Sequence, residues 1–280
     1  MQRVTMLEDL RTIVRDWKRQ GLNVGFVPTM GALHDGHLSL IDASVAVCDR
    51  TIASIFVNPT QFAAHEDLGN YPRTEDRDLA LLTEHGCDLA FCPEADTMYP
   101  AGEESRVAVP ELGAKLEGQF RPHFFGGVAT VVSKLFNMVQ PDKAFFGEKD
   151  FQQVQVIKRM VTDLAFPIEI IPCPTGRAVD GLALSSRNAY LSDAQRRIAP
   201  ALYAAMHRAA IRMRNGTLPG EAITEAVDAL HRAGFDEVQY LEACDPGTLE
   251  PVGHELPDYP CRLIAACWLG KTRLIDNIAI

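Results

Sequence analysis

Two histidines near the start of the chain have the spacing of a shared ligand site. His34 and His37 are three residues apart, so on the first turn of a helix they would lie on one face. The run before them, residues 24–27, has the β-branched and aromatic side chains of a buried strand. A strand, a tight turn and a helix begin a βα unit, whose helix N-terminus binds phosphate in α/β proteins. Two imidazoles there would stabilise negative charge that builds up at a phosphorus centre.

The histidine pair has two other interpretations. Zinc-binding helices usually space their histidines four apart beside an acidic residue, and no third ligand follows here at a typical interval. No protein ligand for a metal is therefore predicted. A solvated surface position for both rings stays open as the second alternative.

Polar side chains also follow a second predicted strand, at 51–57. Asn58 and Gln61 come directly after it. Because open α/β sheets bind ligands beyond the carboxyl ends of their strands, both are candidates for holding a small polar substrate. The alternative is an ordinary loop opened by an Asn-Pro turn.

A strand at 143–146 ends in the same way. Gly147, Lys149 and Asp150 follow it, with Gln153 one turn further on. Lys149 is placed to meet phosphate as a compact charge, and Asp150 to accept from ribose hydroxyls. A solvated charge cluster at a helix N-terminus is the alternative.

A fourth polar loop occupies residues 180–188. Ser185, Ser186 and Arg187 stand in sequence there, between apolar neighbours. Two hydroxyls and a guanidinium can bind a polyphosphate, with the arginine taking the charge of the leaving group. Otherwise the segment is a plain helix-entry loop.

Composition limits the classes of partner. The 280 residues are 47% hydrophobic and carry a net charge of −10, which argues against nucleic acid as the main partner. The seven cysteines mostly lie in apolar runs without a C-x-x-C pair, which suits a reducing compartment. Neither an apolar leader nor a membrane-length stretch is found, so we expect a cytoplasmic protein without membrane contact.

The order of the elements predicts an α/β fold with a smaller α+β domain. Strands and helices alternate up to about residue 175, as in a Rossmann-like parallel sheet, and helices followed by strands come after it. We therefore expect domains at 1–175 and 176–280. The predicted helices are 7–20, 74–86, 128–139, 151–162, 193–215 and 219–234, and the further strands are 88–92, 106–109, 168–171, 237–243, 262–269 and 272–280.

With these loops in place, the chain closely resembles the pantoate:beta-alanine ligase (pantothenate synthetase) family over almost its whole length. One matching segment alone is weak support, whereas five in order are specific. The segments are PTMGALHDGH at 28–37, FVNPTQF at 56–62, YPRT at 71–74, FFGEKD at 145–150 and DGLALSSRN at 180–188.

The resemblance implies a nucleotide-binding domain of the class I synthetase and nucleotidylyltransferase type. It implies that pantoate and Mg-ATP give pantoyl adenylate and pyrophosphate, after which beta-alanine displaces AMP to form pantothenate. Members of the family usually form homodimers. Since the carboxylate of the substrate itself attacks, no strong base is needed. Magnesium is expected to be held by phosphate oxygens and water.

The resemblance also assigns residues by position. His37 matches the principal catalytic histidine and His34 its partner, with Lys149 and Arg187 beside the phosphates. The resemblance assigns pantoate binding to Gln61, Gln153 and Asn58, and beta-alanine binding to Gln61. The ATP-binding set is Met30, His34, His37, Gly147, Lys149, Asp150, Gly176, Leu184, Ser185, Ser186 and Arg187.

A few positions depart from the family pattern. Ala178 stands where the family has Glu, which predicts the loss of a local ion pair. The family's histidine near 124 is Phe124 here, preceded by His123, whose role is open. Leu184 replaces Met, a near-isosteric change, and Gly176 replaces an apolar residue, where a backbone contact to adenine can survive. Arg77 interrupts an acidic cluster.

Three other functions compete with the ligase. Another nucleotidylyltransferase would share the first loop but would need neither Gln61 nor Gln153. A non-catalytic nucleotide sensor would be expected to have lost the histidines or Lys149, which are all present. A dinucleotide-dependent oxidoreductase is disfavoured because no G-x-G-x-x-G follows a strand.

Overall fold

The chain forms two compact units. One comprises Met1–Glu148 with Gln153–Pro174, and the other comprises Lys149–Gln152 with Thr175–Ile280. This computed structural model describes residues 1–62, 69 and 71–280. Among those residues, no helix combines the length and the apolar character needed to cross a membrane.

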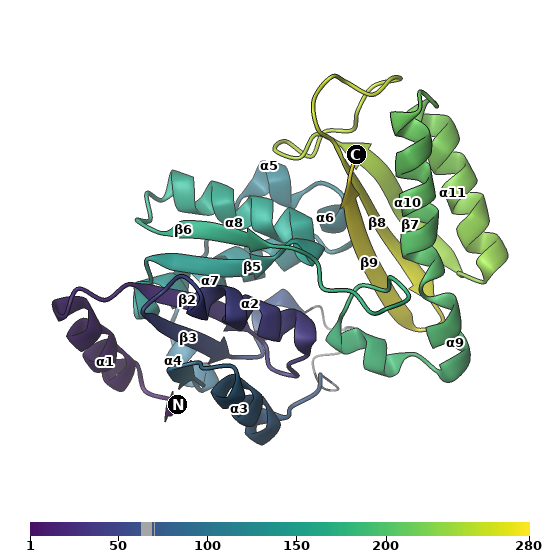
Figure 1. The fold of residues 1–280 in the computed structure, drawn as a ribbon. Coiled ribbons are helices and arrows are strands. Elements are labelled where there is room, and N and C mark those ends of the chain that lie inside the picture. Colours follow the sequence, from purple (N-terminus) through teal and green to yellow (C-terminus); the bar gives the residue numbers. More distant parts are fainter. Residues whose placement is uncertain (63–68, 70) are drawn as a thin grey trace. The chain divides into compact units, whose positions relative to one another are not determined.

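The first unit is built on a six-stranded sheet in the order β1-β4-β3-β2-β5-β6, and all its neighbouring strands run parallel. The prediction of an α/β fold with a Rossmann-like parallel sheet is confirmed (Figure 1). The strands are β1 (Gln2–Val4), β2 (Val24–Thr29), β3 (Arg50–Ile55), β4 (Leu89–Phe91), β5 (Lys143–Gly147) and β6 (Glu169–Cys173).

Helices cover both faces of this sheet. The longer ones are α1 (Leu7–Arg19), α2 (Asp35–Val45), α3 (Glu75–Glu84), α7 (Phe124–Val139) and α8 (Phe151–Asp163), and the short ones are η1 (Pro59–Gln61), η3 (Glu148–Asp150), α4 (Ala95–Met98), α5 (Pro110–Gly113) and α6 (Glu117–Phe120). Side chains of α1, α7 and α8 share one core cluster with the strands, and side chains of α2 and α3 share another.

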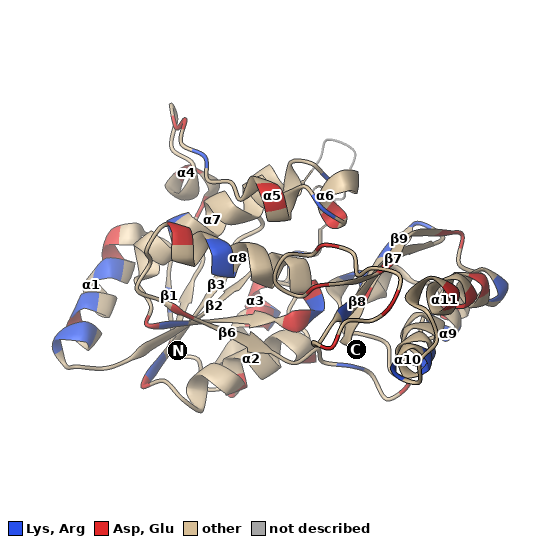
Figure 2. Ribbon diagram, turned by 90° about the horizontal axis from the view of Figure 1, so that it is seen from above, with Lys and Arg blue, Asp and Glu red and all other residues tan. Residues whose placement is uncertain are grey.

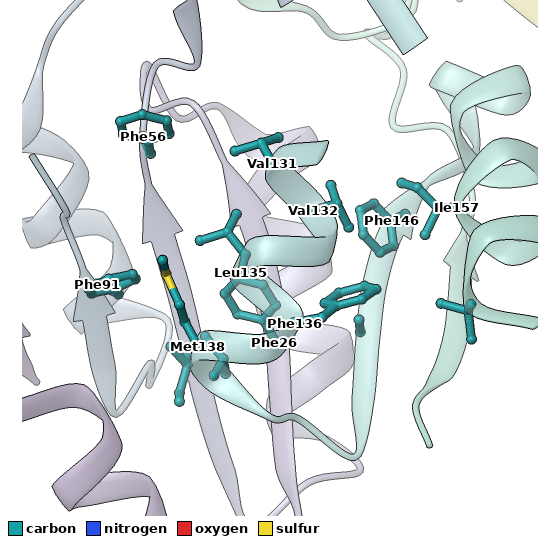
Figure 3. Close-up of a cluster of buried hydrophobic side chains, with 14 of the residues drawn as sticks. Phe26, Phe56, Phe91, Val131, Val132, Leu135, Phe136, Met138, Phe146 and Ile157 are labelled. Atoms are coloured by element: carbon teal, nitrogen blue, oxygen red, sulfur yellow. The ribbon is translucent and has the colours of Figure 1, made fainter. Parts of the chain in front are cut away.

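Aromatic side chains fill much of the core on the α7 face. Phe136 of α7 lies edge-on to three rings, with centroid distances of 6.4 Å to Phe26, 6.3 Å to Phe146 and 5.8 Å to Phe166. Figure 3 shows Phe136 and Leu135 directed toward the strands that carry Phe26 and Phe146. Burial of these rings supplies a large apolar area and fixes α7 against β2 and β5.

The second unit pairs helices with an antiparallel sheet, as predicted. Its strands, in the order β7-β8-β9, are antiparallel and share one core cluster with the helices. The elements are η4 (Ser186–Tyr190), α9 (Asp193–Ile198), α10 (Ala201–Arg214), α11 (Pro219–Ala233), β7 (Glu237–Cys244), β8 (Arg262–Leu269) and β9 (Thr272–Ala279).

Three sequence-based element predictions need correction, and one strand was missed. Strand β1 was not predicted; it pairs with β4 and is too short to show periodicity. Residues 106–109 are not a strand, although Val107 and Val109 pack on the core. Helix α7 begins at Phe124 rather than at 128. The helix predicted over 193–215 is two helices, because proline removes a backbone donor at Pro200, which caps the second of them.

Candidate active site

The candidate site of the first unit lies where β2 and β5 end side by side. These two strands are parallel neighbours in the sheet. The chain leaves β2 for β3 on one side, while β5 and β6 lie on the other. In open α/β sheets the crevice at such a switch point is where ligands bind. The loop after β2, which leads to the histidines, and Gly147 at the end of β5 both belong to this edge.

The loop after β2 is held in an uncommon backbone conformation. Gly31 has φ +79° and Ala32 has φ +50°, in the left-handed region that costs a non-glycine residue about 1–2 kcal/mol. The hydroxyl of Thr29 accepts from the Gly31 N–H at 3.1 Å and donates to the Ser54 carbonyl at 2.7 Å. The loop is therefore fastened to β3 at its first turn.

A buried carboxylate from α3 fixes the next two residues. Asp78, only 1% exposed, accepts from the N–H groups of Ala32 and Leu33 at 2.9 Å each. The Thr74 hydroxyl donates to the same carboxylate at 3.2 Å. These charge-assisted bonds offset the backbone strain of the loop. Asp78 was not predicted as part of the site; an acidic residue one turn after Thr74 was the available signal.

His34 and His37 lie together at the start of α2. His34 is the N-cap, and its Nδ1 accepts from the Gly36 N–H at 3.1 Å. The ring centroids of the two histidines are 4.1 Å apart, and both residues are half-buried. Because Nδ1 of His34 is an acceptor, the proton of the neutral ring is on Nε2. The structure thus brings the predicted pair together at a helix N-terminus.

Asn58 and Gln61 also form a pair. The Asn58 amide donates to Gln61 Oε1 at 3.1 Å and to the Gly127 carbonyl at 3.2 Å, and Asn58 Oδ1 accepts from the Tyr99 hydroxyl at 2.7 Å. The Gln61 amide in turn contacts Met30 Sδ at 3.0 Å. Asn58 is 1% exposed; its amide nitrogen donates to Gln61, while its Oδ1 accepts from Thr60 and Tyr99. In this arrangement Asn58 orients Gln61, which lies beside Met30 of the histidine loop.

Tyr99 completes this support. Burial raises the pKa of its phenol, which favours the protonated hydroxyl that donates to Asn58. No pattern in the sequence indicates this role, because Tyr99 begins an irregular segment between α4 and α5.

The backbone of Gln61 is held by the segment that departs from the family pattern. Arg121 donates to the Gln61 carbonyl at 3.3 Å and pairs with Glu117 at 3.2 Å. The guanidinium carbon lies 3.9 Å from the centre of the Phe124 ring, a favourable cation–π geometry. His123 is exposed at the N-cap of α7. Phe124 therefore supports Gln61 through Arg121.

Gln153 and Glu148 belong to the first unit as well. Glu148 follows β5, and Gln153 lies half-buried on the first turn of α8. The residues between them, Lys149 to Gln152, belong to the second unit.

The second unit carries the other predicted phosphate ligands. Lys149 Nζ lies 3.9 Å from Asp150 Oδ2. The Leu184 N–H donates to the Gly176 carbonyl at 2.9 Å, which closes a small loop before the serines. Ser185 caps η4 by accepting from the Arg187 N–H at 3.3 Å. The group Gly176, Leu184, Ser185, Ser186 and Arg187 is half-buried, and so reachable by a ligand.

Arg177 has an ion-pair partner even though Ala178 supplies no carboxylate. Its guanidinium makes two bonds to Asp276, at 2.6 and 2.8 Å. Ala178 packs instead against the core of this unit. The expected loss of an ion pair at this loop is therefore offset by Asp276 of β9.

Metal ligands do not gather among residues 1–62, 69 and 71–280. No group of three or more His, Cys, Asp or Glu side chains in these residues could hold a metal ion. A divalent cation bound with ATP would draw its oxygen ligands from phosphates and water.

A family model described as Pantoate-beta-alanine ligase matches residues 2–279. The chain belongs to this family. It is 55% identical over 275 residues to the pantothenate synthetase of Hyphomonas neptunium, covering 97% of this chain and 94% of that protein. It is 50% identical over 277 residues to the pantothenate synthetase of Paracoccus denitrificans, covering 99% and 97%. The resemblance inferred from the five segments is confirmed.

Solved structures agree with this membership. The crystal structure of pantothenate synthetase from Thermus thermophilus is 44% identical and superposes with a TM-score of 0.92, covering 99% of each chain. That of pantoate-beta-alanine ligase from Francisella tularensis, complexed with beta-gamma ATP and beta-alanine, is 35% identical with a TM-score of 0.84, covering 99% of this chain and 97% of that one. The fold of the family is therefore preserved throughout the described chain.

A hollow away from these residues is of a different kind. It has a volume of about 810 Å³ and is lined by α1 and by Met138 and Gln140 at the end of α7. Its basic side chains, Arg11, Arg15, Lys18 and Arg19, account for the Lys and Arg colouring along α1 in Figure 2. Its lining includes none of the predicted site residues.

Proposed function

We propose that this protein condenses pantoate with beta-alanine in an ATP-dependent reaction that gives pantothenate, AMP and pyrophosphate through a pantoyl adenylate. The observation that carries the proposal is the pair of His34 and His37 at the N-terminus of α2, whose ring centroids are 4.1 Å apart. Asp78 fixes the loop that leads to them. Membership of the pantoate-beta-alanine ligase family supplies the substrates.

In the first step a carboxylate oxygen of pantoate attacks the α-phosphorus of ATP. The bond from that phosphorus to the bridging oxygen breaks, and pyrophosphate leaves with the electron pair. Negative charge grows on the phosphate oxygens, which the Nε2–H of His34 and the ring of His37 stabilise by position. Lys149, Ser186 and Arg187 of the second unit act on the leaving group.

Pantoate recognition falls to Gln61 and Gln153. A carboxamide offers both a donor and an acceptor, which suits the hydroxyl and carboxylate oxygens of pantoate. The hydrogen bonds from Asn58 and the contact with Met30 give the Gln61 amide a defined orientation before substrate binds. Asn58 thus contributes to the pantoate site through Gln61.

In the second step the amine of beta-alanine, bound beside Gln61, attacks the acyl carbon of the adenylate. The acyl–oxygen bond breaks, AMP leaves, and the nitrogen loses a proton to give the amide. Adenine and ribose are assigned to Met30, Gly147, Asp150, Gly176 and Leu184, and the phosphates also to Ser185.

The remaining parts of the proposal concern the cation, the assembly and the division of labour. Mg²⁺ entering with ATP would neutralise part of the phosphate charge. Residues 1–175 bind ATP and pantoate, and residues 176–280 bring the Ser-Ser-Arg-Asn loop. The protein acts as a homodimer in the cytoplasm. Its seven free cysteines are consistent with that reducing compartment.

Product analysis tests this function. Pyrophosphate release is measured with ATP, Mg²⁺ and pantoate, and then AMP and pantothenate are measured after beta-alanine is added. We expect a stoichiometric burst with pantoate alone and steady turnover only with beta-alanine. ATP binding without any response to pantoate would overturn the ligase and favour a nucleotide sensor or a nucleotidylyltransferase for another substrate. Chelation of Mg²⁺ is expected to abolish the burst.

A further inference from the structure

We propose that Asp276 and Asn277, neighbours on the last strand β9, are positioning residues that fix Lys149 and the 176–187 loop relative to each other. The inference rests on the proposed function, in which these two segments bind phosphate. Both residues are 2% exposed, so they act through other groups. All the contacts involved lie within the second unit.

Asn277 holds the main chain of Lys149. Its side-chain amide donates to the Lys149 carbonyl at 2.9 Å, and its Oδ1 accepts from Arg262 Nε at 2.7 Å. The Arg262 guanidinium carbon in turn lies 4.4 Å from the centre of the Phe151 ring. The Asn277 and Arg262 contacts therefore hold residues 149–151 against β8 and β9. In sequence, residues 149–151 follow β5 of the first unit.

Asp276 holds the loop that leads to Arg187. Its carboxylate makes the bidentate pair with Arg177, and the same guanidinium donates to the Gly181 carbonyl at 3.1 Å. Tyr203 lies against the guanidinium, 4.0 Å from the ring centre. Gly181 has φ +91°, and a Cβ there would come within 2.6 Å of Tyr203. The turn of this loop is thus closed around Arg177. Among the ion pairs of the described residues, Asp276 is the partner of Arg177.

Asn277 and Asp276 are also joined to each other through the strand. The Asn277 N–H donates to Asp276 Oδ1 at 2.7 Å, so one carboxylate is shared by the backbone of Asn277 and the side chain of Arg177. A shift of either residue moves the other. Since a displacement of about 1 Å can cost about 100-fold in rate, this link sets how well the Lys149 ammonium and the Ser186–Arg187 group meet one polyphosphate.

The test is a double-mutant cycle between Asn277 and Lys149. Asn277→Asp keeps the acceptor for Arg262 and places an oxygen against the Lys149 carbonyl, so the lysine segment should shift. We expect the single-turnover rate of pyrophosphate release with ATP and pantoate to fall about 30- to 100-fold. In a Lys149→Met background the same change should cost less than about 3-fold, because the ammonium group that Asn277 positions is gone. A second full loss in that background would overturn the inference.

Controls separate positioning from folding. Thr272→Val changes a buried polar residue of the same strand and should leave the rate within about 2-fold. Asn277→Ala, which removes both side-chain bonds, should repeat the loss and its dependence on Lys149 if Asn277→Asp does not fold. Rates of both Asn277 variants equal to that of Thr272→Val would overturn the inference.

Binding of a non-hydrolysable ATP analogue separates this inference from the proposed function. Asn277→Asp should raise the Kd about 3- to 10-fold in the wild-type background and leave it unchanged in Lys149→Met. This result stands even if the wild-type protein fails to release pyrophosphate with pantoate, which would overturn the proposed function alone. Equal effects on the Kd in both backgrounds would overturn the positioning role.

Discussion

The loop after β2 and the loop at 176–187 are each held by a buried aspartate, and the two aspartates do so by different bonds. Asp78 receives two backbone N–H groups and a hydroxyl, whereas Asp276 receives a guanidinium through two bonds. The first arrangement fixes main-chain geometry next to His34 and His37. The second neutralises a half-buried arginine. Loss of Asp276 should therefore cost more stability than loss of Asp78, and loss of Asp78 should also disturb the loop that carries the histidines.

The first loop is expected to contribute the largest single effect, through His37. His37→Ala should lower the rate of pyrophosphate release about 1000-fold, because it removes a donor that acts on charge formed in the transition state. Thermal unfolding should be nearly unchanged. The exposed His254→Ala serves as the matched control and should keep the wild-type rate. Near-normal release by a folded His37→Ala protein would remove this loop from the chemistry.

The aspartates themselves provide the next test. Asp276→Asn leaves Arg177 without its charge partner and should lower the free energy of unfolding by about 3–5 kcal/mol. Asp78→Asn breaks one or both backbone bonds and should lower it by about 1–3 kcal/mol, while reducing the rate about 30-fold by freeing the strained loop. Urea unfolding and single-turnover kinetics measure the two quantities.

Equal loss of stability in the two variants would contradict the contrast between backbone and ion-pair anchoring. Glu75→Gln is the control for Asp78→Asn, since Glu75 lies on the same helix in an exposed pair with Arg3. Its expected effect on stability is below about 1 kcal/mol.

Tyr99→Phe should have a smaller and more selective effect. It removes the hydroxyl that donates to Asn58, so the Gln61 amide loses part of its orientation. We expect the KM for pantoate to rise about 5-fold with kcat within about 2-fold, as for lost substrate binding. Tyr259→Phe, at an exposed tyrosine, should change neither constant. A fall in kcat alone would place Tyr99 in the chemistry instead.

The smallest expected effect comes from the ion pair between Arg196 and Asp180 of the second loop. A hydrogen bond from Arg196 lowers the pKa of Asp180, so the pair stabilises the folded state above the ordinary carboxyl pKa of about 4. This contribution is lost as the pH falls through the lowered pKa. The Tm of Arg196→Gln should therefore be slightly below that of the wild type at pH 7 and equal to it near pH 2.

A Tm difference that persists at pH 2 would mean that Arg196 acts by packing rather than by charge. Because the side chains of Asp180 and Arg196 are 42% and 39% exposed, solvent screens the pair and the expected difference at pH 7 is small. It contrasts with the less exposed pair that Arg177, on the same loop as Asp180, makes with Asp276 of β9.

The parts of the fold that follow from local patterns could be predicted from the sequence. Strands such as β2 and β3 are apolar runs that end at polar loops, and that pattern yields both the parallel sheet and the placement of His34, His37 and Gln61. Helix α1 ends before Gly21, whose φ is +76°, as its sequence indicates. The errors occur where tertiary packing decides, as at β1 and at residues 106–109.

The supporting residues of the site could not be predicted, for a physical reason. Asp78, Tyr99 and Asp276 each act on a segment more than 35 residues away in sequence, through hydrogen bonds that leave no periodic trace. Asp78 looks like one more acid in the charged first turns of α3, and Asp276 like a polar interruption of a strand. Their burial, which makes these bonds strong, is known only from the fold.

Isotope transfer tests the central claim, that the site activates a carboxylate by adenylation, most directly. Pantoate labelled with ¹⁸O in its carboxylate is converted with ATP and beta-alanine, and the AMP is analysed by mass spectrometry. Attack of the carboxylate on the α-phosphorus predicts one labelled oxygen in each AMP and none in pyrophosphate. Unlabelled AMP formed together with pantothenate would contradict the account.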